Sequence, residues 1–363
     1  MPKKILLGMS GGVDSSFAAS LLKEAGHEVV GVYLRAWSDD LTGVMGGVCP
    51  WQEDVADARR VAAFLGIPFT VIDVREAYKT QVVDVMLKEY AEGRTPNPDI
   101  LCNRSMKFGI LLDLARAEGF DAVATGHYAQ IHSRSNKTFH TLHRATDIKK
   151  DQTYFLWQLT SADLVHIFFP IGCLTKAQVR SEARRRNLPV ANKPDSQGIC
   201  FLGPVDVASF LRLKLKTKCG VVVNHQGRQI GRHDGVALYT LGQRHGFQIS
   251  DGGVSRPHYY VVGKNFARNQ LIVDVEPPAS KILVAMDLNW INDPPQVNDQ
   301  IEARIRHGQQ PQVCQVISDP SMIKNHQSKI TIGFADPQIA ISPGQSVVFS
   351  KGSLILGGGT ISE

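Results

Sequence analysis

Apolar and polar positions follow two different periods over residues 1–204. Short apolar runs such as Lys4–Gly8 and Glu28–Leu34 have the composition of buried strands. Stretches with helical spacing, such as Ser15–Ala25 and Glu53–Leu65, lie between them and end at a glycine. Strands that alternate with helices imply right-handed crossovers and a parallel sheet covered on both faces. We therefore predict an α/β domain over residues 1–204, with further elements at Phe69–Val74, Lys79–Glu92, Ser105–Ala117 and Asp121–Thr125.

The pattern changes after residue 205. Residues 205–275 mix a helical stretch, Val205–Leu215, with short polar segments and predict a small central α+β domain. Proline and glycine punctuate the rest of the chain, and the short alternating runs between them favour an antiparallel β-barrel over residues 276–363. These runs begin at about residue 257 and are Tyr259–Gly263, Gln270–Val275, Gln300–Arg306, Gln312–Ile317, Lys329–Phe334 and Ser346–Phe349.

Composition narrows the class of protein. A hydrophobic fraction of 43% and a charged fraction of 20% are ordinary for a soluble globular protein, and the net charge of +6 weakly favours a polyanionic partner. The start of the chain has no signal-peptide pattern, and no apolar run is long enough to span a membrane, so we expect a cytoplasmic protein. The 6 cysteines are scattered, which favours thiols over a disulfide framework and disfavours a zinc site.

The run Ser10-Gly11-Gly12-Val13-Asp14-Ser15 joins the first predicted strand to the first helix. Glycines allow positive φ and close approach of the backbone, so successive amide groups can surround an anion. The helix N-terminus adds unpaired N–H donors, and Ser10, Ser15 and Ser16 add hydroxyl donors. The lysine of the common mononucleotide loop does not follow these glycines. The pattern S-G-G-x-D-S instead resembles the pyrophosphate-binding loop of the N-type ATP pyrophosphatases, which split ATP into AMP and pyrophosphate.

Two polar loops end in a cysteine. The loop Arg94–Asn103 is stiffened by two prolines, and its Cys102 stands just ahead of a predicted helix that Asn103 would cap. A thiol near a helix N-terminus has its thiolate favoured, and Asp99 is close enough in sequence to act as a general base. A second loop of the same character holds Cys200. Taken singly, each cysteine also fits a buried, inert thiol; together, beside an ATP site, they suggest persulfide chemistry.

With these motifs in place, the chain resembles the tRNA-specific 2-thiouridylase family over nearly its whole length. The phosphate loop alone also fits GMP synthetase or NAD synthetase, but the combination is specific. The matching stretches are Gly8–Ser15, Arg94–Phe108, Ala124–Ala129, Lys150–Leu156, Phe169–Gly172, Asp195–Phe201 and Thr240–Gly246. The resemblance implies an N-terminal ATP pyrophosphatase domain of the adenine nucleotide alpha hydrolase kind, a small central domain and a C-terminal barrel that binds tRNA.

The resemblance also assigns roles by position. Cys102 would be the nucleophile, Cys200 would carry the persulfide, and the two would form a transient disulfide. Asp99 would act as acid or base and, with Asn97 and Pro98, would contact the target base. ATP would be bound by Gly8, Met9, Ser10, Gly11, Gly12, Val13, Asp14, Ser15, Leu34 and Gly126, and tRNA by His127, Lys150, Asp151, Gln152, Arg306, His307 and Gln345.

The implied reaction is sulfur transfer to the 2-position of the wobble uridine in the tRNAs for Lys, Glu and Gln. ATP would adenylate the 2-carbonyl oxygen so that AMP can leave, and Mg²⁺ would neutralise the departing pyrophosphate. Either the persulfide on Cys200 attacks the activated carbon, or Cys102 frees sulfide that attacks. The base must leave the anticodon stack to react, and a separate persulfide-carrying protein would supply the sulfur. The basic helix Arg180–Arg186 and the lysines at 214, 216 and 218 are candidates to hold tRNA phosphates.

Two other functions stay open on sequence alone. An ATP-dependent amide ligase of the GMP or NAD synthetase kind would need a glutaminase domain or an ammonia route, and no such segment is evident. A non-enzymatic RNA-binding protein with a degenerate ATP loop would have no need of Asp14, Asp99, Cys102 and Cys200. Formation of both 2-thiouridine and AMP would separate the three.

Overall fold

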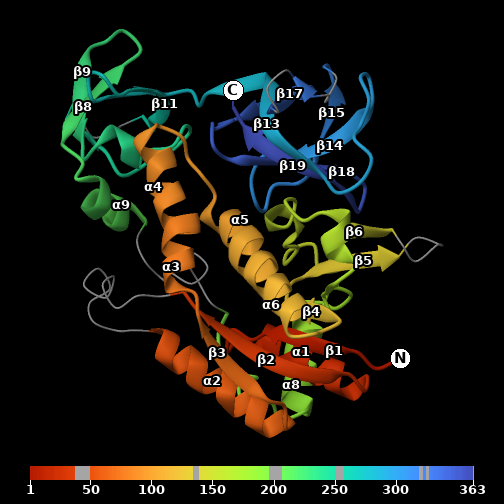
Figure 1. Cartoon of the computed structure of the whole chain (residues 1–363). Helices are drawn as coiled ribbons and strands as arrows, with labels where there is room; N and C mark the ends of the chain where they lie inside the picture. Colours follow the sequence, from red (N-terminus) through yellow and green to blue (C-terminus); the bar gives the residue numbers. More distant parts are fainter. Residues whose placement is uncertain are drawn as a thin grey trace.

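The computed structural model of the chain describes residues 1–36, 50–133, 139–195, 207–250, 257–318, 322–323 and 327–362. They form three units, which Figure 1 shows as a parallel sheet with its helices at the bottom, a small sheet at the upper left and a barrel at the upper right. The helix α5–α6 lies between the parallel sheet and the barrel, and α3–α4 runs from the parallel sheet to the small sheet (Figure 1).

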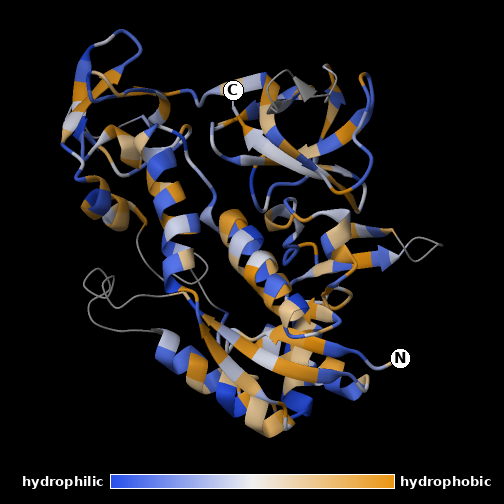
Figure 2. Cartoon of the chain, in the orientation of Figure 1, coloured by the Kyte–Doolittle hydropathy of each residue, from blue (hydrophilic) through white to orange (hydrophobic). Residues whose placement is uncertain are grey.

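The parallel sheet is built from apolar strands that are buried on both faces. Residues Ile5, Leu6 and Leu7 are all inaccessible or nearly so, as expected for strands covered by helices on two sides. Figure 2 shows the resulting contrast, with the strands largely hydrophobic and helices such as α4 mixed. The strand order is β3-β2-β1-β4-β7, with β1 Lys4–Gly8, β2 Glu28–Arg35, β3 Phe69–Asp73, β4 Ala122–Ala124 and β7 Ile167–Phe168. The predicted α/β domain with a parallel sheet is confirmed.

Helices cover the two faces of this sheet. One face packs against α1 (Val13–Glu24), α2 (Pro50–Leu65) and α8 (Lys176–Arg185), which share a core with Ile5 and Leu7. Two longer helices on the other face each contain a π-helical stretch. The first comprises α3 Arg75–Tyr78, Lys79–Val83 and α4 Asp84–Ala91, and the second comprises α5 Pro98–Cys102, Asn103–Ile110 and α6 Leu111–Ala117.

The second of these helices corrects the sequence analysis. It begins at Pro98 rather than near Ser105, because Asn97 caps it by accepting a 3.1 Å hydrogen bond from the backbone N–H of Asp99. Proline at the first helical position loses no hydrogen bond and presets φ. Asn103 therefore lies inside the helix and does not cap it, and Cys102 lies more than a full turn from the helix start.

The small sheet has the order β10-β9-β8-β12-β11. It is accompanied by α9 (Val207–Leu215), which confirms the predicted helix there. The runs at 259–263 and 270–275 share the alternating pattern that predicted the barrel, but they lie within the predicted central domain and belong to this sheet, where β12 pairs in parallel with β8. Its strands are β8 Gly220–Asn224, β9 Gln229–His233, β10 Gln248–Ile249, β11 Tyr260–Asn265 and β12 Gln270–Asp274.

The C-terminal unit is a closed antiparallel barrel, as predicted. Closure follows from β13 pairing with both β17 and β19. The barrel strands are β13 Ala279–Trp290, β14 Gln300–Arg304, β15 Gln312–Val316, β17 Gln327–Ile339, β18 Ser346–Lys351 and β19 Leu354–Ile361, and β16 Met322–Ile323 pairs with β17.

A hairpin of the first unit extends the barrel's sheet. The strands β5 (Ala129–Ser133) and β6 (His140–Arg144) pair with each other, and His143 of β6 is in register with Leu354 of β19. Sequence analysis did not predict this hairpin. Within the described part of the chain, no helix combines the length and the apolar character that a membrane crossing requires.

Candidate active site

The phosphate loop, residues 8–15, joins β1 to α1 at the carboxyl edge of the parallel sheet. Gly11 has a φ of +74°, and a Cβ there would lie 2.3 Å from the carbonyl oxygen of Asp54, so only glycine fits. The backbone N–H of Ser10 donates to Oγ of Ser15 (3.2 Å), and Oγ of Ser16 donates to the carbonyl of Gly12 (2.8 Å). Ser15 and Ser16 are buried and shape the loop from within, whereas Ser10 is exposed.

A second loop presses against the start of α1. Gly126 follows β4, the neighbour of β1, and a Cβ on it would lie 2.6 Å from the backbone nitrogen of Ser15. The side chains of Met9, Val13 and Leu34 are buried in the core. Their side chains are therefore not available to a ligand, and only their backbone groups could take the predicted ATP-binding role.

The side chain of Asp14 is held by two partners from distant segments. Lys176 Nζ lies 2.8 Å from each of its carboxylate oxygens, and the hydroxyl of Tyr128 donates to Oδ1 at 2.8 Å. Burial, reinforced by the charge of Asp14, raises the pKa of Tyr128, so its hydroxyl stays protonated and donates. Lys176 opens α8, directly after the helix cap Thr175.

Lys176 also joins the phosphate loop to Asp195. Its Nζ lies 2.8 Å from Oδ1 of Asp195, and this carboxylate receives Lys150 Nζ at 2.8 Å and Arg180 Nη2 at 2.5 Å. Burial alone would raise the pKa of Asp195, but the three cations outweigh it and hold that pKa well below its usual range. We call Asp14, Lys176, Asp195, Lys150 and Arg180 the charge network; it contains three cations and two carboxylates.

Sequence analysis missed Lys176 and Tyr128. One local pattern could have drawn attention to Lys176. Thr175 and Gln178 form a capping box, which marks the start of a helix, and helix N-termini commonly bind anions. No local pattern marked Tyr128, whose role depends on a partner 114 residues away.

A lysine fixes the segment that leads to Asp195. Lys193 Nζ donates to Asp54 (2.7 Å) and to Asp57 (2.5 Å) on α2. Burial would raise the pKa of Asp57, but Lys193 and Arg60 lower it overall. Because the carbonyl of Asp54 also faces Gly11, α2 aligns the phosphate loop with this segment.

Cys102 is fully buried among apolar residues of the parallel-sheet core, and Asp99 is half-buried near the start of the same helix. The thiol lies more than one turn from the helix start, so the helix dipole favours its thiolate form less than the sequence suggested. Beside it, the buried Oδ1 of Asn103 has no hydrogen-bond partner among the described residues. Cys200, and with it the expected Cys102–Cys200 disulfide, falls on residues 196–206, outside the described residues.

Two of the expected tRNA contacts are interior. The ring of His127 lies between Phe108 and Phe169, Thr125 Oγ1 is 2.7 Å from its Nδ1, and burial lowers its pKa far below the usual value. This imidazole is neutral and inaccessible, so in this structure it supports the fold rather than presenting a surface to RNA.

Asp151 is the second buried residue among the expected contacts. It receives Arg304 Nη1 at 2.7 Å, Thr153 Oγ1 at 2.9 Å and Arg144 Nε at 3.3 Å, and Arg304 is itself buried. This buried ion pair joins the first unit to barrel strand β14. The structure therefore gives Asp151 an interdomain role in place of a surface one.

The remaining expected tRNA contacts differ from one another. Lys150 belongs to the charge network, and Oε1 of Gln152 accepts from the backbone N–H of Tyr128 at 2.9 Å. Arg306 and His307 are exposed on the barrel, where the imidazole packs on Phe155. Gln345 instead donates to the carbonyl of Thr95 at 2.9 Å.

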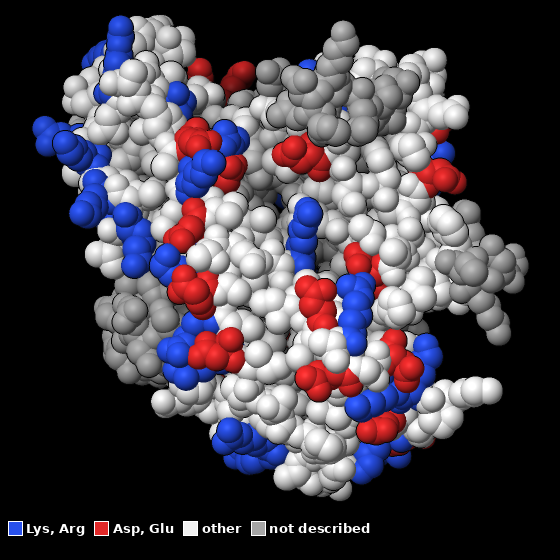
Figure 3. Space-filling model, viewed as in Figure 1, with Lys and Arg blue, Asp and Glu red and all other residues white. Residues whose placement is uncertain are grey.

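Exposed basic side chains gather on the small-sheet unit. Figure 3 shows them as blue groups along its edge. One of them, Arg212, pairs with Asp234 at 2.9 Å. Such a basic edge suits a polyanion. The exposed members are Arg212, Lys214, Lys216, Lys218, Arg228 and Arg232.

No three His, Cys, Asp or Glu side chains gather into a metal-binding cluster in the described ranges. A Mg²⁺ ion needs less, because it is commonly held by one or two carboxylates together with substrate phosphates. Asp14, at the mouth of the phosphate loop, is a donor of the required kind, and Lys176 is the cation that Mg²⁺ would displace or join.

Comparison with known proteins covers the whole chain. Residues 3–204 match the family model described as tRNA methyl transferase HUP domain, 208–274 the tRNA methyl transferase PRC-barrel domain and 280–361 the aminomethyltransferase beta-barrel domain. A relative from Chloroflexus aggregans, named tRNA-specific 2-thiouridylase MnmA, is 44% identical over 99% of this chain and 98% of its own. A relative of the same name from Geobacillus thermodenitrificans is 42% identical over 99% of this chain and 95% of its own.

Proposed function

The chain belongs to the tRNA-specific 2-thiouridylase family, and we propose that it uses ATP to replace the 2-oxygen of the wobble uridine with sulfur in the tRNAs for Lys, Glu and Gln. The charge network carries this proposal. It links Asp14 of the phosphate loop to Asp195, which stands five residues before Cys200 in the sequence. The phosphate loop is thereby tied to the segment that leads toward Cys200 in the sequence. The relatives' names favour thiolation over amide ligation.

The phosphate loop would bind ATP through its backbone. The amide groups of Gly11, Gly12 and the first turn of α1 would receive the phosphates, and the backbone near Leu34 and Gly126 would receive adenine. Lys176 would turn from Asp14 toward the leaving pyrophosphate. Mg²⁺ held by Asp14 and the phosphates would neutralise the charge that develops there.

Activation makes the uridine oxygen a leaving group. The 2-oxygen attacks the α-phosphorus of ATP, the bond to pyrophosphate breaks, and the uridine becomes O-adenylated. Asn97, Pro98 and Asp99 would hold the flipped base at the start of α5. The buried Oδ1 of Asn103, which has no hydrogen-bond partner in the described part of the chain, would accept a hydrogen bond from the base.

Sulfur transfer would complete the reaction, with Asp99 managing protons. The outer sulfur of the persulfide on Cys200 would attack C2 and expel AMP; the thiolate of Cys102 would then attack Sγ of Cys200, which breaks the persulfide S–S bond, leaves the sulfur on C2 and closes the Cys102–Cys200 disulfide. In the alternative route, Cys102 attacks the persulfide first and frees sulfide, which then attacks C2. Because Cys102 is fully buried, either route needs its neighbours to part when tRNA binds.

The remaining parts of the proposal concern partners and location. Residues 1–204 would be the catalytic domain, 205–275 a linking domain and 276–363 a barrel that holds the anticodon arm of tRNA. The basic edge of the small sheet, together with Arg306 and His307, would contact RNA phosphates. A persulfide-bearing protein would load Cys200, and the enzyme would act in the cytoplasm.

A reconstituted reaction tests the function. The protein is incubated with ATP, Mg²⁺, a sulfide source and unmodified tRNA, and 2-thiouridine and AMP are measured. We expect both products from the native protein and from the control Cys173→Ser, an exposed cysteine, but no thiolated product from Cys102→Ser or Cys200→Ser. Thiolation by both variants at the native rate would contradict the proposed roles. AMP formed with a purine nucleotide or deamido-NAD instead of tRNA would identify an amide ligase.

A further inference from the structure

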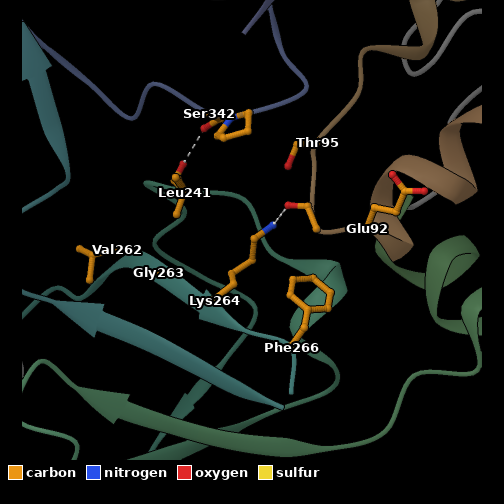
Figure 4. Close-up of a pocket in the computed structure, with 10 residues that line it drawn as sticks. Glu92, Thr95, Leu241, Val262, Gly263, Lys264, Phe266 and Ser342 are labelled. Carbon is orange, nitrogen blue, oxygen red and sulfur yellow. Dashed lines mark hydrogen bonds between the residues drawn. The ribbon is translucent and has the colours of Figure 1, made fainter. Parts of the chain in front are cut away.

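The turn at residues 93–95, between α4 and α5, lies where all three units meet. A cavity of about 270 Å³ opens beside it, and Figure 4 shows the side chains that line it. Gly93 and Thr95 come from the first unit, Leu241 and Lys264 from the small-sheet unit, and Ser342 from the barrel. Thr240 and Leu241 begin the T-L-G-Q-R-H-G motif, which has no role in the proposed chemistry.

The small-sheet unit holds the turn through two side chains. Lys264 Nζ donates to the carbonyl oxygens of Gly93 (2.6 Å) and Tyr239 (3.0 Å), and Figure 4 shows the first of these bonds. The hydroxyls of Thr95 and Thr240 are hydrogen-bonded at 3.0 Å. The motif therefore contacts the turn directly.

The barrel holds the same turn from the other side. The backbone N–H of Thr95 donates to the carbonyl of Pro343 at 2.8 Å, and Nε2 of Gln345 donates to the carbonyl of Thr95 at 2.9 Å. Ser342 Oγ donates to the carbonyl of Leu241 at 3.4 Å and so joins the barrel to the small-sheet unit. All three polar groups of Thr95 are thus occupied by the other two units.

The backbones approach so closely that side chains do not fit. A Cβ on Gly93 would lie 2.6 Å from the ring of Phe266, and one on Gly344 would lie 2.8 Å from the nitrogen of Thr95. Both glycines have positive φ, of +86° and +90°, which other residues rarely adopt. The junction is a fitted contact between three segments.

Lys264 is an unusual residue for a purely structural contact. Among the described residues its Nζ bonds to two carbonyls and to no carboxylate, it lies 5.8 Å from the centre of the Phe266 ring, and burial lowers its pKa to about 8. Burying an ammonium opposes folding, and an apolar side chain would attach the two units at lower cost. Unlike an apolar side chain, Lys264 donates a hydrogen bond that fixes the direction of the Gly93 carbonyl.

We propose that Thr95 and Lys264 are positioning residues, through which docking of the small-sheet unit and the barrel fixes the start of α5. Asn97, the cap of α5, stands two residues after Thr95, and Asp99 and Cys102 follow on that helix. The assignment of α5 to base binding and sulfur transfer rests on the function proposed above. The junction makes the geometry of that helix depend on both of the other units.

Two substitutions with matched controls test this in the full-length protein. Lys264→Met is compared with Lys281→Met, an exposed lysine on β13, and Thr95→Val with Thr70→Val, an exposed threonine on β3. Hydrogen exchange is followed in peptides that cover residues 93–103. We expect exchange to rise about fivefold or more in Lys264→Met and Thr95→Val, because each loses a hydrogen bond that closes the turn, and to stay unchanged in the controls.

Kinetics separate positioning from mere stabilisation. Both test variants should lower kcat for thiolation about five- to tenfold and leave KM for ATP unchanged, because the phosphate loop is held by other contacts. The melting temperature of Lys264→Met should not fall below that of Lys281→Met. Unchanged exchange in residues 93–103 in both variants overturns the proposal, and so does a loss of kcat that only follows a lower melting temperature. If the native protein does not thiolate tRNA, the proposed function is wrong, but the positioning proposal is not affected. The hydrogen-exchange measurement still tests that proposal, because it does not depend on activity.

Discussion

The phosphate loop and the turn at 93–95 are both held from outside, but by different chemistry. Asp14 of the phosphate loop is held by the side-chain charges of the charge network. The turn at 93–95 is held largely through its own backbone: the carbonyls of Gly93 and Thr95 accept from the side chains of Lys264 and Gln345, and the N–H of Thr95 donates to the carbonyl of Pro343. At the phosphate loop, an incoming phosphate or cation can replace the groups that hold Asp14. At the turn, the hydrogen bonds join segments of the protein to one another, and no substrate group competes for them.

This difference matches what each region must do. A network with two carboxylates and three cations can rearrange when a polyanion arrives, because Lys176 can exchange one negative partner for another. Hydrogen bonds to the backbone of a fitted segment keep that segment in one geometry. The charge network beside the phosphate loop is therefore suited to rearrange when a ligand binds. The helix that carries Asp99 and Cys102 is suited to keep its position.

The largest effect is expected where charge serves as a fixed anchor, between Asp151 and Arg304. Arg304→Met leaves the buried carboxylate of Asp151 paired, among the described residues, with Arg144 alone, and should lower the free energy of unfolding by about 3–5 kcal/mol. Urea unfolding measures the loss. The control Arg116→Met removes an exposed pair with Asp113 and should cost under about 1 kcal/mol. Equal losses in the two variants would show that burial of the pair does not matter.

Next in size is the fit of Gly126 against the start of α1. Gly126→Ala places a methyl group 2.6 Å from the nitrogen of Ser15, so the phosphate loop must shift. AMP formation should fall about a hundredfold, the scale for misplaced reacting groups. Gly119→Ala is the control, because its Cβ meets nothing within 4 Å and its φ of +68° costs only stability. Normal AMP formation by Gly126→Ala would mean that the loop tolerates displacement.

A smaller effect tests whether Lys176 is an exchangeable partner. Lys176→Met should weaken binding of pyrophosphate about tenfold, because the amine no longer meets the phosphates. Titration calorimetry with pyrophosphate measures this, and Lys79→Met, which breaks an exposed pair with Asp84, is the control. If pyrophosphate binds Lys176→Met as tightly as the native protein, Lys176 holds only Asp14 and Asp195.

The smallest effect is a pH dependence at Lys264. Its pKa falls from an unfolded value of 10.5 to about 8 on folding, so between these two pH values the unfolded chain binds more protons. Stability therefore rises with pH across this window, by no more than about 1.4 kcal/mol per pH unit. The difference in free energy of unfolding between the native protein and Lys264→Met, measured from pH 7.5 to 9.5, should show this rise. A flat difference would mean that the amine is solvated.

Much of the fold followed from local patterns. Continuous apolar runs predicted β1 and β2, and short alternating runs predicted β14, β15 and β18. Burial of a strand requires apolar residues at regular positions along it, so the pattern can be seen in the sequence. The hairpin β5–β6 escaped prediction; one of its strands pairs with β19, some 200 residues later, and no local pattern records such a partner. Helix α5 was placed too late because Pro98 was interpreted only as a loop former, although proline also suits the first helical position.

The sequence by itself determined the phosphate loop, because its glycines, serines and Asp14 are contiguous and act through their own backbone. It also placed Asn97, Asp99 and Cys102 on one short segment. Only the tertiary structure decided which residues hold these pieces. Lys176 meets Asp14 across 162 positions, Arg304 meets Asp151 across 153 and Gln345 meets Thr95 across 250. Such long-range pairs produce no periodic pattern among neighbouring residues. In the sequence each partner is an ordinary polar residue, and only folding brings the two together.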